Sequence, residues 1–107
     1  MERQIYFSEM PVPQEWGNKR IVPLNIKEEV TEDNGVKKTG YRADLVPKVE
    51  QPLTVDNIVD AAITSEYGED GQKRILRNMA RGNDPEVAAF NSFVNEIREA
   101  AKAAGYE

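Results

Sequence analysis

The sequence lacks two residue types that carry much of protein chemistry. It contains no cysteine, which excludes disulfides, thiolate zinc sites, iron–sulfur clusters and cysteine nucleophiles. It also contains no histidine, which removes the commonest general base and the commonest transition-metal ligand. The seven glycines form no phosphate-binding motif, and Ser8, Ser65 and Ser92 have no histidine or S-x-x-K lysine to activate them. We therefore expect no catalytic residue, cofactor or metal ion, and predict that the protein is not an enzyme.

Acid–base chemistry with carboxylates alone is the one enzymatic alternative that these absences leave open. It would need acidic side chains that converge in a pocket, for example around a magnesium ion. The pairs Glu28/Glu29 and Glu32/Asp33 lie instead beside a predicted solvent-exposed turn, where charges are ordinarily solvated. The acidic segment Glu66–Asp70 lacks the regular oxygen ligands of a calcium-binding loop.

Long hydrophobic runs are also missing, and positive charge is in the minority. No stretch approaches the ~20 apolar residues that span a bilayer, and the first residues do not have the pattern of a signal peptide. We therefore expect a soluble, cytoplasmic protein that does not bind a membrane. The 14 Lys and Arg residues against 19 Asp and Glu give a net charge of −5, which argues against binding of a nucleic-acid duplex by phosphate neutralisation.

The 107 residues suggest a single domain, 1–107, whose two halves differ in composition. Five of the six prolines, the β-branched run and the clearest hairpin turn lie before residue 53, and the alanine-rich, helix-periodic sequence lies after it. We predict an α+β fold in which a β-hairpin over 21–47, widened by a possible strand near Ile5–Phe7, packs against two or three helices within 53–105. Residues 1–20 form a segment that either lies along a sheet edge or is mobile until a partner orders it.

The hairpin is indicated by Asn34-Gly35, the preferred central pair of a two-residue type I′ turn. This turn sets a register in which paired residue numbers sum to 69. The expected pairs on the more apolar face are Leu24–Leu45, Ile26–Ala43, Glu28–Tyr41, Val30–Thr39 and Glu32–Lys37. Charges near the turn predict that the tip projects into solvent.

Helix signals follow in the second half. Thr54 is an expected N-cap, and Tyr67–Gly71 is expected to interrupt the helix that it begins. A second short helix would turn Ile75, Leu76 and Met79 inward and end near Gly82. Asp84 and Pro85 have the pattern of an N-cap and N1 residue for a long third helix that ends at Gly105.

Candidate binding residues come from three places. Tyr6 and Trp16 lie in a proline-rich segment without periodicity, where aromatic side chains either anchor a protein partner or dock on the protein's own core. We expect Trp16→Ala to weaken partner binding and to leave thermal stability nearly unchanged. Arg74, Arg77 and Arg81 are spaced to share a helix face that could meet an acidic partner or a phosphate backbone. The alternative is that these cations only complement the helix dipole and nearby acids.

The order of features in residues 58–104 is similar to that of a known group of proteins. Ile63 is followed by Glu66-Tyr67-Gly68, by Arg74-Ile75-Leu76-Arg77-Asn78, by a break at Gly82-Asn83-Asp84 and by Phe90-Asn91-Ser92-Phe93-Val94. This pattern resembles the C-terminal helical part of small proteins encoded beside tail or tail-fibre genes in phages and prophages. The resemblance implies a tail component or assembly factor that joins the virion after assembly, and it transfers no functional residue.

These observations together predict a non-catalytic structural or assembly protein whose partner is another protein. The prediction also allows the chain to form a homo-oligomer. The alternative is a small regulator that contacts nucleic acid or an acidic partner through the Arg74, Arg77 and Arg81 face, although the acidic balance disfavours nucleic acid.

Overall fold

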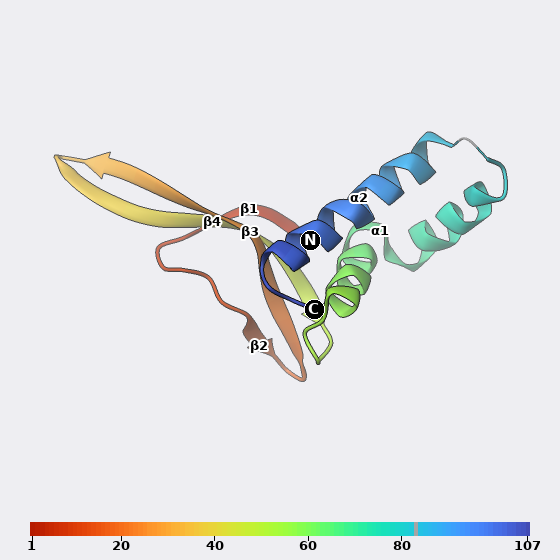
Figure 1. Ribbon diagram of the computed structural model, residues 1–107, viewed down its shortest axis with the longest axis horizontal. Coiled ribbons are helices and arrows are strands. Elements are labelled where there is room, and N and C mark those ends of the chain that lie inside the picture. Colours follow the sequence, from red (N-terminus) through yellow and green to blue (C-terminus); the bar gives the residue numbers. More distant parts are fainter. Residues whose placement is uncertain (83) are drawn as a thin grey trace.

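The computed structural model describes residues 1–82 and 84–107, apart from the side chain of Trp16. Four strands form one antiparallel sheet in the order β1-β4-β3-β2. They are β1 (Glu2–Phe7), β2 (Gln14–Trp16), β3 (Lys19–Asp33) and β4 (Val36–Val49), and the helices α1 (Val55–Met79) and α2 (Pro85–Ala103) follow them. The helices pack on one side of the sheet, and residues 8–13 pass on the other (Figure 1). The predicted α+β class is confirmed.

The β3–β4 hairpin turns at Asn34-Gly35, where both residues have positive φ. The predicted register holds from Asp33↔Val36 to Lys27↔Arg42 and then changes, because β3 bulges between Leu24 and Lys27. The predicted pair Leu24–Leu45 is therefore wrong, since Leu24 lies opposite Asp44. Ile26–Ala43 is wrong as well, because Ile26 lies within the bulge between the pairs Leu24↔Asp44 and Lys27↔Arg42, and Ile26 is exposed whereas Ala43 is buried.

Asp44 explains where the bulge falls. It is 2% exposed and accepts hydrogen bonds from the Gln4 backbone N–H and from Asn25 Nδ2, both at 3.0 Å. Gln4 and Asn25 have φ values of 56° and 53°, and each marks a bulge in a strand that flanks β4. An extra residue in each neighbouring strand thus aims two donors at one buried carboxylate, which supplies the partners that a buried charge requires.

The first 16 residues serve both edges of the sheet. β1 pairs with β4 and extends the strand that was predicted near Ile5–Phe7, while β2 pairs with the start of β3 at the opposite edge. Glu2–Phe7 and Gln14–Trp16 thus lie at sheet edges, which is one of the two predicted alternatives for residues 1–20, and residues 8–13 form no strand. Arg3 anchors β1 to α2 through a hydrogen bond of 3.1 Å to Glu96, and this bond raises the pKa of the Arg3 guanidinium above its ordinary value.

The helix ends follow the sequence signals closely. Thr54 Oγ1 accepts the Asn57 N–H at 3.2 Å, and Asp84 accepts the Glu86 N–H at 2.8 Å with Pro85 at the first turn. Gly105, with φ 94°, ends α2 in a Schellman motif. In that motif the Gly105 N–H donates to Lys102 O at 3.0 Å and the Tyr106 N–H donates to Ala101 O at 3.1 Å.

The predicted interruption of the first helix is a kink at one residue. Gly68, with φ 67° and ψ −177°, is the non-helical position within α1. The part before Gly68 packs on the sheet, and the part after it continues along α2, as Figure 1 shows. Gly82 also has a positive φ, two residues beyond the C-cap Ala80.

The core joins the wide end of the hairpin to both helices. Its buried members are Val22, Leu24, Val46, Val49, Val55, Ile58, Val59, Ala62, Phe93, Ile97 and Ala101. The prediction that the hairpin packs on the second half is therefore confirmed. The inward prediction holds for Ile75, which is 1% exposed, and is wrong for Leu76 and Met79, which are 66% and 43% exposed. Beyond Gly68, α1 lies along α2 and away from the sheet (Figure 1), and its buried positions in the described chain are Gly71 and Ile75.

The molecule is elongated. Its extents are 58 × 31 × 23 Å and its radius of gyration is 16.4 Å, against about 13 Å for a compact chain of this length. Its accessible surface of 7169 Å² likewise exceeds the roughly 6,000 Å² that area scaling gives. Among the residues described, neither helix is long and apolar enough to cross a membrane.

Candidate functional site

The part of the hairpin beyond the core, residues 26–42, is the feature that departs most from a compact domain. We call it the distal ribbon. It leaves the body as a two-stranded projection (Figure 1), about 25 Å long at ~3.4 Å per residue. Isolated two-stranded ribbons are marginally stable in water, so a projection of this length needs a reason other than the stability of the fold.

Three exposed apolar side chains lie on the distal ribbon. Val30 and Val36 are 60% and 57% exposed, and Ile26 is 39% exposed. Val30 lies on the same face as Glu28 and Glu32, because alternate residues of a strand share a face. Val36 lies on the other face. Each face of the distal ribbon thus presents an exposed β-branched side chain, a residue type that is common in strands.

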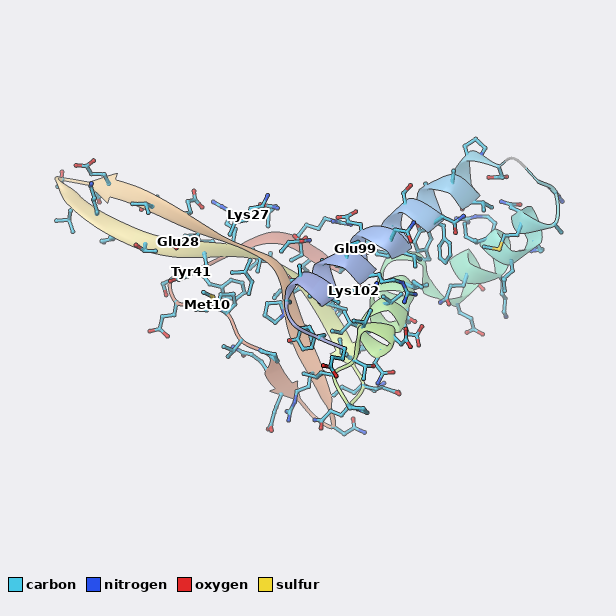
Figure 2. The ribbon with its side chains drawn as sticks, in the orientation of Figure 1. Met10, Lys27, Glu28, Tyr41, Glu99 and Lys102 are labelled. Atoms are coloured by element: carbon cyan, nitrogen blue, oxygen red, sulfur yellow. The ribbon has the colours of Figure 1, made fainter. Side chains whose placement is uncertain are left out.

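The two strands of the distal ribbon carry opposite charge. The β3 side, residues 26–33, has one lysine and four acids (Glu28, Glu29, Glu32 and Asp33), a net charge of −3. The β4 side, residues 36–42, has Lys37, Lys38 and Arg42 and no acid, a net charge of +3. Figure 2 labels Lys27 and Glu28 where the β3 side leaves the body. The distal ribbon is therefore acidic along one edge and basic along the other.

Only part of this charge is used inside the ribbon. Arg42 Nε lies 2.7 Å from Glu29 Oε2, so these two residues form an ion pair, and both side chains are partly exposed. Within residues 1–82 and 84–107, the other six charged side chains of the distal ribbon form no ion pair, although Glu32 lies directly opposite Lys37. They are Lys27, Glu28, Glu32, Asp33, Lys37 and Lys38, and cross-strand pairing inside the hairpin thus does not account for their charges.

Tyr6 lies at the base of the distal ribbon. Its ring covers the backbone of Gly40, where a Cβ would overlap the ring, and the Arg42 guanidinium lies 5.7 Å from the ring centroid. Glycine at position 40 therefore allows the Tyr6 ring to pack directly on the backbone of β4. Tyr6 is still 48% exposed, so this predicted anchor both docks on the sheet and presents an open face.

The other predicted binding residues lie elsewhere. Trp16 ends β2, at the edge opposite β1, and its side chain is outside the described residues. Arg74 pairs with Glu86 at 2.6 Å, which offsets its charge. Arg77 lies in the last turn of α1, and Arg81 lies beyond the helix end. The structure therefore does not bring Tyr6 together with the arginines.

A hollow of about 550 Å³ between the end of β4 and α1 is the larger of two surface depressions described. Its lining includes Lys19, Lys48, Glu50, Asn57, Asp60 and Thr64. Lys19 lies 3.7 Å from Glu50, so two of these charges face each other. In the described part of the chain, no group of three or more acidic side chains is placed to hold a metal ion.

Sequence reasoning missed the distal ribbon as a site, although it predicted a solvated tip. The signal was present in two features: the segment from Lys27 to Arg42 is mostly polar, and most acids lie on one strand while most bases lie on the other. Neither feature is informative until the extent of the core is known.

Comparisons with protein-family models, with curated proteins and with solved structures find no match to this chain. The evidence on function therefore comes from the distal ribbon and from the position of Tyr6 at its base.

Proposed function

We propose that this protein is a non-catalytic structural or assembly protein that binds another protein through the distal ribbon. The observation that carries the proposal is a projection of about 25 Å that adds no residue to the core and leaves Val30, Val36 and six charged side chains without partners in the described chain. Exposed apolar groups rimmed by charge are characteristic of protein interfaces.

A role in phage tail assembly is the specific form that we propose. It is supported by the resemblance of residues 58–104 to proteins encoded beside tail and tail-fibre genes. An assembly role also agrees with a shape in which a small body carries a long projection, because such a projection can reach into a neighbouring subunit.

The test shortens the ribbon without changing its register. Deletion of residues 28–33 and 36–41 joins Lys27 to Asn34 and Gly35 to Arg42. Lys27 and Arg42 are already paired across the hairpin, so the same Asn-Gly turn can connect them directly. A photo-reactive residue at position 30 of the full-length chain, compared with one at Glu99 on α2, identifies what contacts the ribbon in cells. We expect cross-links to a distinct protein from position 30, and loss of that protein from the shortened chain. If the shortened chain retains every protein partner, the proposal is wrong.

The alternative function is a regulator that contacts nucleic acid or an acidic partner through its basic helical face. Arg77 and Arg81 are exposed and support it, whereas the ion pair of Arg74 with Glu86 removes one of its three cations. Binding of DNA or RNA at low salt, falling steeply as salt is added, would favour this function.

A further inference from the structure

We infer that the distal ribbon binds its partner by strand addition at the free edge of β3, and that the added strand carries two cationic residues four positions apart with a β-branched residue between them. This inference rests on the proposed function and specifies the chemistry of the partner.

The free edge follows from the sheet topology. β2 covers β3 only at Lys19–Ile21, so residues 26–33 have no neighbouring strand on that side within the described chain. In a two-residue hairpin, the residues that flank the turn exchange backbone hydrogen bonds, and the pattern alternates from there. Asp33 and Thr31 therefore bond toward β4, and Glu32, Val30 and Glu28 direct their N–H and C=O groups outward.

The outward residues also define the side chains that an added strand would meet. Glu28, Val30 and Glu32 share one face, and the two glutamates are about 14 Å apart at ~3.4 Å per residue. Neither glutamate forms an ion pair in the described chain. A strand laid along this edge places a residue beside each of the three. Lysine or arginine beside each glutamate and valine or isoleucine beside Val30 is the complementary order.

A second copy of this chain is a poor occupant of the edge. Two copies related by a two-fold axis would pair β3 with β3 and place a net charge of −3 against −3. Copies that all point the same way would pair β3 of one ribbon with β4 of the next and would repeat every ~10 Å, the width of two strands. The molecule measures 31 × 23 Å across its shorter axes, so the bodies of neighbouring copies would overlap. A copy that points the opposite way and presents its β4 edge to β3 has only residues 36–40 of that edge free, because β1 pairs with β4 from Tyr41 onward.

The acidic edge therefore has two effects. It opposes self-association, as charged edge strands do in many sheets, and it admits an extended basic segment. The added strand runs antiparallel to β3, because in that orientation the residues opposite Glu28, Val30 and Glu32 also direct their own N–H and C=O groups toward β3.

The test uses the full-length protein and a labelled heptapeptide, Thr-Lys-Thr-Val-Thr-Lys-Thr. Binding is measured by fluorescence anisotropy, and the site by NMR shifts of the Glu28, Val30 and Glu32 amides. Two peptide controls leave the protein unaltered: one has glutamate for lysine, and one is N-methylated at the lysine and valine nitrogens. We expect saturable binding of the first peptide, and at least about tenfold weaker binding of both controls.

The protein variants separate the edge from net charge. Glu28→Lys with Glu32→Lys and the control Glu69→Lys with Glu99→Lys change the net charge equally, but only the first pair lies on the edge. We expect at least about tenfold loss of affinity for the edge variant and little change for the control. Equal binding of the N-methylated peptide, or equal loss in both variants, would overturn strand addition. So would formation of dimers by the wild-type chain that Val30→Pro abolishes.

These results are separable from the proposed function. If position 30 cross-links a partner that the shortened chain loses, but the basic peptide does not bind, then the ribbon binds protein by another mode. If the shortened chain keeps its partners, the proposed function itself fails.

Discussion

Removal of the Asp44 carboxylate is the sharpest test of how this sheet is held together. Asp44→Ala leaves the Gln4 N–H and the Asn25 amide without their acceptor, and both bonds measure 3.0 Å. A hydrogen bond to a charged group contributes about 1.5–3 kcal/mol. Because Gln4 and Asn25 are themselves exposed and can turn partly to water, we expect a total loss of about 2–4 kcal/mol in the free energy of unfolding.

The measurement is urea unfolding followed by far-ultraviolet circular dichroism. Asn25→Gly removes the amide and keeps the positive φ accessible, so it isolates the hydrogen bond from backbone strain. We expect Asp44→Ala and Asn25→Gly to be coupled by about 1 kcal/mol in a double-mutant cycle. Asp33→Ala, at the exposed turn, is the control and should change stability by less than about 0.5 kcal/mol.

Two results would refute this account of Asp44. One is a cost of Asp44→Ala below about 1 kcal/mol, which would show that the buried carboxylate is not an important acceptor. The other is strict additivity with Asn25→Gly, which would show that the bulge in β3 forms independently of Asp44.

Three further predictions concern the helices and the C-terminal segment. Gly68→Ala should destabilise by about 1–3 kcal/mol in urea unfolding, because φ 67° with ψ −177° is a combination that residues other than glycine hardly adopt, even though a Cβ there meets no atom; a stabilised variant would contradict this reasoning. Asp84→Ala should cost about 1 kcal/mol by loss of the α2 N-cap, while Asp84→Asn should retain most of the stability; equal losses in the two variants would show that the charge of Asp84, and not its hydrogen bond to the Glu86 N–H, stabilises α2. Burial raises the pKa of Tyr106 above its ordinary 10.0. The stability that the buried, neutral Tyr106 contributes to the folded state is therefore fully present below pH 10. It is lost as the pH rises through the pKa of Tyr106 in the folded protein, because the unfolded state releases the proton first. Tyr106→Phe should flatten the fall in melting temperature above that pH, and an unchanged slope would argue against this contribution.

The features that the sequence predicted correctly are those whose cause is local. Asn34-Gly35 fixes the turn, because few other pairs accept two positive φ values, and the turn then sets the register as far as Lys27↔Arg42. Thr54, Asp84 and Gly105 mark helix ends, since each acts through hydrogen bonds or a backbone angle within its own turn.

The tertiary structure decided what depends on distant partners. The register changes at Asn25 because Asp44 is buried and needs donors from two strands that the sequence does not place beside it. Leu76 and Met79 are exposed because the kink at Gly68 carries the end of α1 beyond the sheet. The distal ribbon became recognisable as a candidate binding site only once the core was seen to end at Leu24, since burial is a property of the assembled fold and not of the strand.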